Sequence, residues 1–306
     1  MGRIAALDLG SNSFLLTVAD VTPHGLAELH DESHVTRLSE GLSQSGCISD
    51  AAARRSLDVL TRFRDMLQAW DVDAVYAVGT AVFRKARNAD AFRNQAEQTL
   101  GVPIVVISGE QEAELSFRSV ADDPVFSADR LTVGDIGGGS FELASRGECA
   151  GSLVRVSVPL GAVRLSERHL LSDPITPAQR CELTREVESV LVNSAVPIQP
   201  LCVGVGGTFV NLASLHLGLG HVAHEAVHGV TLTCDAVGRM ADRLAALSTG
   251  ERAAIAEMEP ERAPIIHAGA LTLAGFMRIY NIPEVRVSRR GIRWGVLYEH
   301  AAAHRS

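Results

Sequence analysis

The sequence predicts an α/β protein built from two related lobes, and three observations lead to this fold class. Strand-like and helix-like segments alternate along both halves of the chain, which is typical of sheets flanked by helices. A unit of strand, aspartate and glycine turn occurs at residues 8–13 and again at residues 135–140, about one domain later. The 306 residues are 46% hydrophobic and 21% charged, which is enough chain and apolar surface for two cores.

The first half is expected to begin with a β-hairpin. Ile4–Leu9 and Phe14–Val18 are apolar runs joined by a turn of Gly, Ser and Asn. A helix is predicted over Ser49–Trp70, because apolar residues recur there at helical spacing after a Ser-Asp start. The elements expected next are a strand over 74–78, a helix over 89–100, a strand over 102–107 and a helix over 110–120.

The second half is expected to repeat the hairpin. The run that begins at Leu131 reaches Asp135, passes through a glycine turn and continues in the run Phe141–Ala144. A third glycine turn, Gly204–Thr208, follows a short apolar run and precedes a helix expected from about Phe209. Both halves therefore carry strands that lead into glycine turns.

The charge balance restricts the class of partner. The chain has 36 acidic and 28 basic residues and a net charge of −8, which disfavours a nucleic-acid coat or an anionic membrane surface. No apolar run approaches the ~20 residues that a membrane span needs. Lys85 is the only lysine, so an anion clamp would consist of arginine and backbone N–H groups. We therefore expect neither nucleic acid nor membrane as a partner.

The cysteines and the N-terminal stretch favour a cytoplasmic location. The five cysteines lie at least 21 residues apart, a spacing that forms no zinc or redox motif and suits a reducing compartment. Asp8 and Asp20 interrupt the apolar stretch near the N-terminus, so no signal peptide is expected.

The glycine turns are candidate phosphate-binding sites, because small residues let several backbone N–H groups approach one anion. The predicted phosphate-binding residues of the turns are Gly10, Ser11, Asn12, Ser13, Gly137, Gly138, Gly139, Ser140, Gly206, Gly207 and Thr208. Asp8 and Asp135 would repel a phosphate unless a cation lay between, which favours Mg²⁺. Ordinary hairpins with turn aspartates are the alternative, and the repetition of the pattern favours the phosphate interpretation.

The turns match neither of two common nucleotide-binding motifs. Lys85 does not lie in the G-K-[ST] context of a Walker A loop, and the third turn lacks the last glycine of G-x-G-x-x-G. P-loop and NAD chemistry are therefore disfavoured.

A family resemblance rests on segments spread over the whole chain. They are residues 6–14, 79–84 with Asn88, 107–113, 135–142, 159–165, 206–208, 227–229 and 268–269. The turns resemble those of the acetate and sugar kinase, Hsp70 and actin superfamily. Within it, the chain is similar to the exopolyphosphatase/guanosine pentaphosphate phosphatase (Ppx/GppA) family in its short, two-domain form.

This resemblance implies the lobes and their boundaries. It implies two ribonuclease H-like (actin-like ATPase) lobes with an interlobe cleft, each with a mixed five-stranded sheet. The N-terminal lobe would comprise residues 1–115 plus 291–306, with the final helix returning to it. The C-terminal lobe would comprise residues 116–290.

The resemblance also implies a catalytic base. In the family it is a glutamate that follows the Ile-Ser-Gly turn, and the matching residue here is Glu112. Glu110 and Glu114 are the neighbouring competitors, and Gln111 stands where many members have an acid. From the residues alone, a solvated carboxylate at a helix start is the competing interpretation of Glu112.

The remaining site residues follow from the same resemblance. The family's metal-binding acids match Asp135 and Glu142, to which the repeated pattern adds Asp8, and the expected ion is Mg²⁺ with Mn²⁺ as the alternative. The family's phosphate-binding arginine matches Arg84, although short basic stretches are often solvated surface. Phe141 replaces the usual threonine, which would remove a hydroxyl beside the site.

The activity implied is Mg²⁺-dependent hydrolysis of terminal phosphate from inorganic polyphosphate. A guanosine pentaphosphate 5'-phosphohydrolase is the alternative enzyme, since both substrates present a terminal phosphoryl group. A non-catalytic sensor of polyphosphate or nucleotide is the alternative from another class, which the intact acids disfavour. A sugar or acetate kinase would need an acceptor site and an adenosine pocket that the sequence does not reveal. A homodimer is left open.

Two further clusters have open interpretations. Four histidines, His216, His221, His224 and His228, fall close together, either as a metal site or as a solvated loop in which His228 positions the chain. The arginines within residues 286–293 form either a surface patch or a track for the distal phosphates of a long polyanion.

Overall fold

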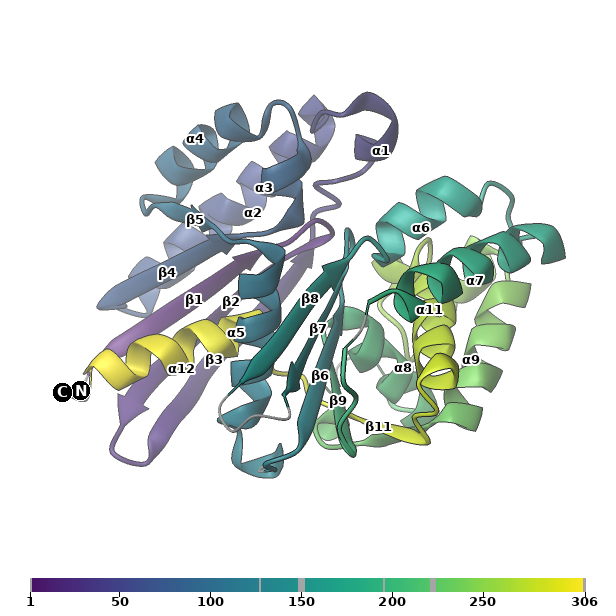
Figure 1. Cartoon of the computed structure of the whole chain (residues 1–306). Coiled ribbons are helices and arrows are strands. Elements are labelled where there is room, and N and C mark those ends of the chain that lie inside the picture. Colours follow the sequence, from purple (N-terminus) through teal and green to yellow (C-terminus); the bar gives the residue numbers. More distant parts are fainter. Residues whose placement is uncertain (1, 127, 148–151, 195, 221–223, 305–306) are drawn as a thin grey trace. The chain divides into compact units, whose positions relative to one another are not determined.

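The computed structural model describes residues 2–126, 128–147, 152–194, 196–220 and 224–304 (Figure 1). The chain forms two compact units, one of residues 1–119 with 292–306 and one of residues 120–291. The boundaries predicted from the sequence were 115/116 and 290/291. None of the helices in the described ranges is long and apolar enough to cross a lipid bilayer.

The first unit contains a five-stranded mixed sheet with the order β3-β2-β1-β4-β5. Its strands are β1 (Arg3–Leu9), β2 (Ser13–Thr22), β3 (Gly25–Val35), β4 (Ala74–Gly79) and β5 (Ile104–Val106). β2 runs antiparallel to both β1 and β3, whereas β4 pairs parallel with β1 and β5 pairs parallel with β4. The predicted hairpin of β1 and β2 is confirmed. The strand order of the whole sheet is that of a ribonuclease H-like lobe.

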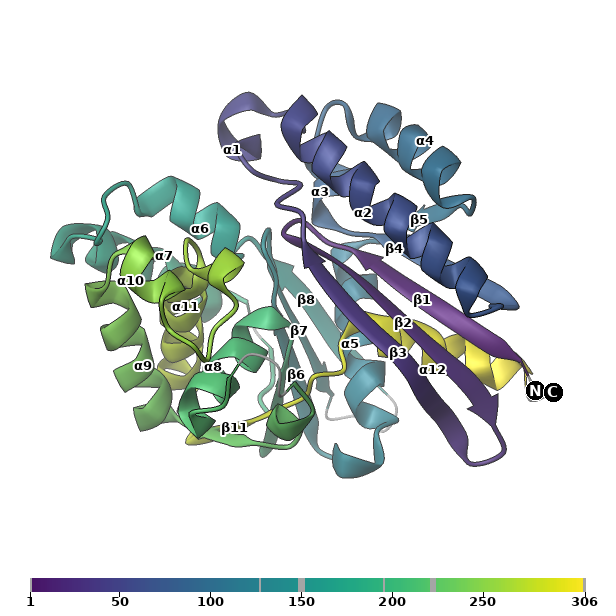
Figure 2. The same cartoon turned by 180° about the vertical axis from the view of Figure 1, so that it is seen from behind.

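Helices cover both faces of this first sheet. Those of the unit are α1 (Leu42–Ser45), α2 (Asp50–Ala69), α3 (Ala81–Lys85), α4 (Ala89–Leu100), α5 (Gly109–Ala121) and α12 (Ile292–His304). Along β1, Leu7 and Leu9 face the core beneath α2 and α4, whereas Ile4 and Ala6 face α12 (Figure 2). The side chains of a strand alternate between its two faces, and this alternation produces the two cores. The predicted return of the final helix is confirmed.

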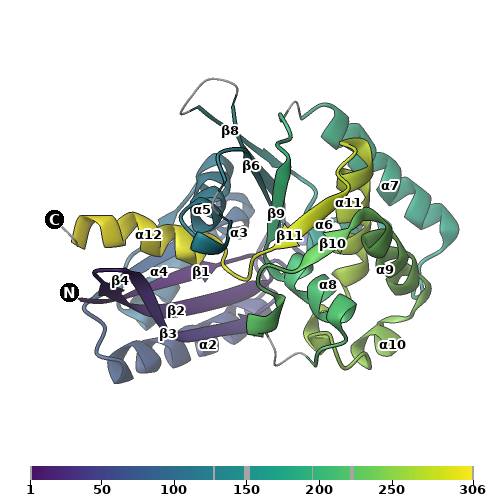
Figure 3. The same ribbon diagram turned by 90° about the horizontal axis from the view of Figure 1, so that it is seen from below.

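The second unit repeats the same sheet order and adds one strand. Its strands are β6 (Leu131–Ile136), β7 (Phe141–Arg146), β8 (Leu153–Val158), β9 (Leu201–Val205), β10 (Thr231–Thr233) and β11 (Glu284–Val287). The order β8-β7-β6-β9-β11 corresponds to β3-β2-β1-β4-β5. The expectation of five strands is wrong for this unit, because β10 pairs antiparallel with β11 at the edge (Figure 3).

One large core joins the second sheet to its helices. The helices are α6 (Ala162–His169), α7 (Pro177–Val192), α8 (Gly207–Leu217), α9 (Cys234–Ala246), α10 (Thr249–Ala253) and α11 (Ile266–Ile279), with short 3₁₀ turns at Pro124–Phe126, His224–Val227 and Pro260–Arg262. Phe141 and Leu143 of β7 belong to the same buried cluster as Val187 of α7 and Phe276 of α11. The Phe141 and Phe276 rings meet edge to face, with centroids 5.2 Å apart.

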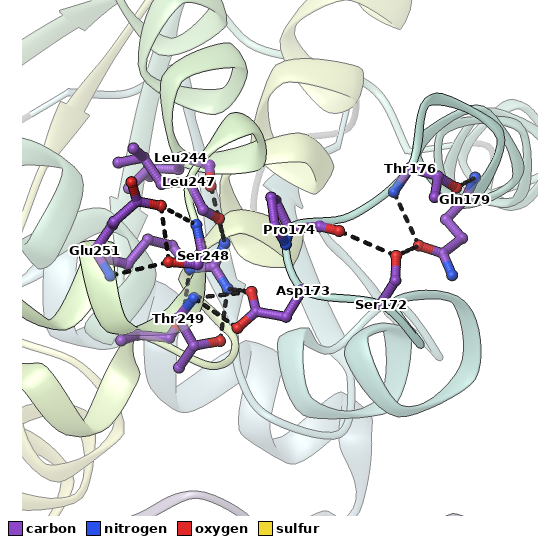
Figure 4. Close-up of polar contacts among 12 residues, drawn as sticks. Ser172, Asp173, Pro174, Thr176, Gln179, Leu244, Leu247, Ser248, Thr249 and Glu251 are labelled. Atoms are coloured by element: carbon purple, nitrogen blue, oxygen red, sulfur yellow. Dashed lines mark hydrogen bonds and ion pairs between the residues drawn. The ribbon is translucent and has the colours of Figure 1, made fainter.

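The buried Arg252 makes hydrogen bonds to several loops of the second unit. The side chain of Arg252 is 1% exposed. Its Nε donates to the Ala263 carbonyl at 2.7 Å, and its Nη1 donates to the carbonyls of Leu244, at 3.0 Å, and Leu247. Its Nη2 lies 3.4 Å from Asp173, which in turn accepts a hydrogen bond from the Thr249 N–H (Figure 4). One guanidinium group thus joins four chain segments.

His267 of α11 should make the stability of the protein dependent on pH. Burial, helped by the positive charge of Arg252, lowers the pKa of His267 to about 3. Below an unfolded pKa of about 6.5 the unfolded chain therefore binds a proton that the folded chain does not bind. This proton uptake stabilises the unfolded state, so stability is lost as the pH falls. The loss should amount to about 2 kcal/mol between pH 6.5 and pH 5.

Urea unfolding at several pH values checks this expectation. The wild type is compared with His267→Gln, and the difference between their two pH profiles isolates His267 from the other histidines. The substitution should flatten the profile between pH 5 and pH 6.5. Parallel profiles for the two proteins would contradict the expectation.

Candidate active site

The predicted site residues of the first unit meet at one edge of its sheet. In the parallel pairing, Leu9 of β1 lies beside Gly79 of β4, which lies beside Val106 of β5. The three carboxyl ends lead into the first glycine turn, into α3 with Arg84 and into α5 with Glu112. Ligands of open α/β sheets bind at such carboxyl ends.

The first glycine turn is held rigidly in place. The Gly10 N–H donates to the Ser13 carbonyl at 3.0 Å and closes the turn. The Asn12 carbonyl accepts from the N–H groups of Thr36 and Arg37, both at 2.9 Å. A Cβ on Gly10 would lie 2.9 Å from the Ser13 carbonyl oxygen, so the turn requires glycine there. The Gly10 N–H is thus used inside the turn, and phosphate binding by this turn stays a prediction.

Glu112 is buried and contacts the predicted phosphate-binding arginine. Its side chain is 6% exposed, and its Oε1 accepts a hydrogen bond from Nη1 of Arg84. The same Nη1 donates to the Ile107 carbonyl at 2.5 Å, which fixes the guanidinium beside β5. Glu110 is exposed and Glu114 is partly buried. Burial and the contact with Arg84 therefore set Glu112 apart from its two neighbours.

The start of α5 explains why glutamine can stand at position 111, where an acid was expected from the family resemblance. The Gln111 side chain accepts from the Ser108 N–H at 2.8 Å, and the Ser108 hydroxyl accepts from the Gln111 N–H at 3.2 Å. This reciprocal pair is a capping box, in which glutamine serves as well as glutamate. Gln111, the residue before Glu112, thus fixes the start of α5.

The two predicted metal-binding acids of the second unit lie side by side. Asp135 of β6 and Glu142 of β7 are directly opposite in the antiparallel pair, and both are buried. The Ser157 hydroxyl donates to Oε1 of Glu142 at 2.7 Å and orients it. Two carboxylates are a suitable hard-oxygen donor set for Mg²⁺, which completes its shell with waters and phosphate oxygens. The described residues contain no group of three His, Cys, Asp or Glu side chains placed for a metal.

A comparison of the β1–β2 hairpin with the β6–β7 hairpin shows where Asp8 and Phe141 lie. In the first unit the residue opposite Asp8 is Leu15, so the pair of acids belongs to the second hairpin alone. Phe141 corresponds to Phe14, and both rings are fully buried on the face of the strand opposite to the acid. The Phe141 ring therefore belongs to the core and points away from the acid pair.

The second glycine turn packs closely against the start of α6. The Gly137 N–H donates to the Ser140 carbonyl at 3.0 Å, so this hydrogen, like that of Gly10, is used inside the turn. The Gly137 carbonyl accepts from the Ala162 N–H at 2.9 Å. A Cβ on Gly161 would lie 2.3 Å from the Gly138 oxygen and from the Ser140 nitrogen. Only glycine at position 161 therefore lets α6 support the turn.

The third glycine turn lies against the acid pair. Gly206 has φ of 85°, and a Cβ there would lie 2.5 Å from Oδ1 of Asp135. The Thr208 hydroxyl donates to the Ile136 carbonyl at 3.3 Å, at the end of β6. Helix α8 begins at Gly207, two residues before the predicted start. The first backbone N–H groups of the helix, which have no partner within it, therefore belong to this turn. The second unit thus brings both of its glycine turns to Asp135.

An arginine that the sequence analysis missed lies on the third turn. A Cβ on Gly207 would lie 2.0 Å from Cζ of Arg262, so the guanidinium packs directly on this glycine. Nε of Arg262 donates to Glu259 at 2.6 Å. The amide of Asn211 bridges the two segments, because it donates to the Gly207 carbonyl at 2.9 Å and accepts from the Glu259 N–H at 3.0 Å. No motif or spacing in the sequence links position 262 to the turn.

The structure describes the side chains of two of the four histidines in the cluster. His216 is exposed on α8, and Nε2 of His228 lies 3.3 Å from the buried Asp123. His221 and the side chain of His224 lie outside the described residues. Burial tends to raise the pKa of Asp123, but the nearby His228, the hydrogen bond from the Val125 N–H and the charge of Arg290 lower that pKa below its usual value.

The arginines of residues 286–293 make contacts inside their units. Nη1 of Arg290 lies 2.9 Å from Asp123, and Arg286 lies over the Phe126 ring at 4.8 Å from its centroid. Arg293 contacts Asp31 of the first unit. Three of the four arginines are therefore held by contacts within the protein, and a phosphate track there remains a prediction.

Comparisons with known sequences give a consistent result. A sequence profile of the Ppx/GppA phosphatase family matches residues 17–304. Exopolyphosphatase 2 of Mycobacterium tuberculosis is 33% identical over 97% of this chain and 95% of its own length. A guanosine-5'-triphosphate,3'-diphosphate pyrophosphatase of Vibrio atlanticus is 30% identical over 96% of this chain, which spans 58% of that protein.

Solved structures show the same similarity. The Ppx/GppA family member of Aquifex aeolicus is 26% identical, with a TM-score of 0.82 over 100% of this chain and 99% of that one. An exopolyphosphatase from Cytophaga hutchinsonii is 27% identical, with a TM-score of 0.88 over 98% of each chain.

Proposed function

The chain belongs to the Ppx/GppA phosphatase family and is a phosphoanhydride hydrolase, and we propose from this premise that it releases terminal phosphate from inorganic polyphosphate with the help of Mg²⁺. The observation that carries the proposal is the buried contact of Glu112 with Arg84 at the carboxyl edge of the first sheet. A buried base beside a phosphate-binding guanidinium is what hydrolysis of a phosphoanhydride requires.

In this proposal the first unit supplies the base and an anchor for the terminal phosphoryl group. Arg84 binds phosphoryl oxygens through its planar fork, which holds the phosphorus near Glu112. Glu112 orients the attacking water and accepts its proton. N–H groups of the first glycine turn beyond Gly10 bind further oxygens of the chain end.

The second unit supplies carboxylates for the cation and two more phosphate turns. Asp135 and Glu142 would hold Mg²⁺, which when bound offsets negative charge on the phosphates. The cross-strand pairing puts the two residues opposite one another, and the hydroxyl of Ser157 orients the Glu142 carboxylate. In this proposal, N–H groups of the turns ending in Ser140 and Thr208 bind phosphate oxygens beside this pair. We place the reaction in the cytoplasm, as the cysteine spacing suggests.

Phosphate release tests the activity. The purified chain is incubated with tripolyphosphate, with polyphosphates of increasing length and with guanosine pentaphosphate, each with MgCl₂ or with EDTA. We expect release from polyphosphate that stops in EDTA. Release from guanosine pentaphosphate alone would favour the second candidate, which the similarity to the Vibrio pyrophosphatase supports. Full activity in EDTA would contradict the role of Mg²⁺.

Ser157→Ala tests the metal-binding role of Glu142 without removing a carboxylate. Loss of a hydrogen bond to a metal ligand typically costs about 10–100-fold in metal affinity. The Mg²⁺ concentration for half-maximal activity should therefore rise about tenfold or more. Ser145→Ala is the matched control, because its hydroxyl lies on the neighbouring strand β7 and contacts Thr132 at 2.9 Å instead. Equal Mg²⁺ dependence of both variants would contradict the assignment.

A further inference from the structure

A cavity of about 550 Å³ lies between helices α7, α9 and α11 of the second unit. This volume falls within the range of small-molecule sites. None of the residues assigned above to phosphate or metal binding lines it. α11 packs against both α7 and α9, as Figures 1 and 2 show, so the lining comes from one layer of helices. The cavity is therefore a separate feature of this unit.

Arginines dominate the charged lining of this cavity. Arg180 and Arg185 come from α7, and Arg278 comes from α11, whereas Asp242 and Glu188 are the acids. Arg180 pairs with Asp242, and Arg278 pairs with Glu188 at 2.7 Å. The side chains of both pairs are 42–62% exposed, and such pairs contribute only about 0–1 kcal/mol. Both guanidinium groups can therefore exchange a carboxylate for a ligand phosphate at little cost.

The third arginine is directed at a thiol. Nη2 of Arg185 lies 3.4 Å from the Sγ of Cys181, one helical turn earlier, and both side chains are exposed at the cavity. A thiol is a weak hydrogen-bond acceptor, so this contact satisfies a guanidinium poorly. A phosphate oxygen would be a much stronger acceptor in the same place.

A glycine in the wall keeps the cavity open. Gly238 lies inside α9, where glycine lowers helix stability relative to alanine. A Cβ there would meet no atom within 4 Å, so close packing does not require glycine at this position. The side chain that it lacks would project into open space. Ala241 and Ala274 add small residues, and Leu271 adds an apolar surface.

We propose that this cavity binds a nucleoside phosphate, at a site distinct from the glycine turns. The phosphates lie against Arg185, Arg180 and Arg278, whose guanidinium forks suit phosphate oxygens. The nucleoside lies over Leu271 and the small residues of the opposite wall. The size of the cavity and its mixed arginine and apolar lining favour a nucleotide over an inorganic anion.

Protection of Cys181 from alkylation tests this proposal locally. The full chain is treated with iodoacetamide, and the modification rate of each cysteine is followed by mass spectrometry with GTP, with tripolyphosphate or with neither. These probes share three phosphates and differ in the nucleoside. At a GTP concentration of about ten times its Kd, Cys181 should react about tenfold more slowly. Cys47, in the first unit, should react at an unchanged rate.

Two variants locate the effect. Gly238→Leu fills the cavity and Arg185→Gln removes a guanidinium, so both should abolish the protection by GTP. Arg64→Gln, an exposed arginine of α2, is the matched control and should keep it. Circular dichroism confirms that each variant is folded. Because the readout is a thiol in the cavity, it does not depend on phosphate release at the proposed active site.

Several results would overturn the proposal. They are an unchanged Cys181 rate at millimolar GTP, equal protection by tripolyphosphate, or protection that persists in Gly238→Leu. Slower reaction of Cys181 at higher protein concentration without GTP would show that a second copy of the chain covers the cavity. That result would also overturn the assignment to a nucleotide.

Discussion

Replacing Glu112 with glutamine should lower the kcat for polyphosphate hydrolysis by about 10²–10⁴-fold, the usual contribution of a general base. The glutamine amide cannot accept the proton of the attacking water. Its oxygen can still accept a hydrogen bond from Arg84, so the anchor for the phosphate should be kept. We therefore expect KM to change little. Initial rates of phosphate release, with tripolyphosphate and with long polyphosphate, measure both constants.

Glu110→Gln is the matched control for this experiment. Glu110 lies two residues earlier in the same helix turn, is exposed and contacts the Ser108 hydroxyl at 2.9 Å. It should lose less than about twofold in kcat, since surface substitutions have small effects. If Glu112→Gln keeps wild-type turnover on both substrates, Glu112 is not the base. A thermal melt of each variant separates loss of chemistry from loss of fold.

Replacing Arg252 with alanine should lower the free energy of unfolding by about 3–5 kcal/mol. The substitution leaves the carbonyls of Leu244, Leu247 and Ala263 without their donor in a buried place. Each unsatisfied buried acceptor costs about 1–3 kcal/mol. Urea unfolding followed by circular dichroism measures the change, which should appear as a lower midpoint at an unchanged m-value.

Two comparisons sharpen this expectation. Arg252→Lys keeps the charge but not the planar fork, so it should lie between alanine and wild type. Arg168→Ala removes an arginine that is 56% exposed and pairs with Glu186 at 3.0 Å. That change should cost only about 0–1 kcal/mol, as exposed ion pairs do. A loss below about 1 kcal/mol for Arg252→Ala would show that its network is not structural.

The parts of the fold that could be predicted are those with a strong local signal. The helix over residues 89–100 has apolar residues at helical spacing, and the structure has the same helix. Strand β3 was missed because its sequence carries acids and histidines in place of an apolar run. Strand β10 has three residues, which is too short to show any period.

The candidate site could be predicted only in part. The family resemblance implied the positions of Glu112, Arg84 and the acid pair, because from the residues alone a solvated helix-start carboxylate and a solvated basic stretch were the competing interpretations. Arg262 could not be, because it reaches the third turn from a segment more than fifty residues away along the chain. The orientation of Phe141 depends on strand register, which a residue-by-residue match does not reveal.

The discontinuous composition of the first unit affects how the protein can fold during synthesis. The sheet of β1 to β5 is complete in sequence long before α12, which covers one of its faces, leaves the ribosome. Translation at roughly 5–20 residues per second delays that helix by on the order of ten seconds or more. Ile4, Ala6 and their neighbours therefore lack the apolar side chains of α12 while the second unit is being synthesised.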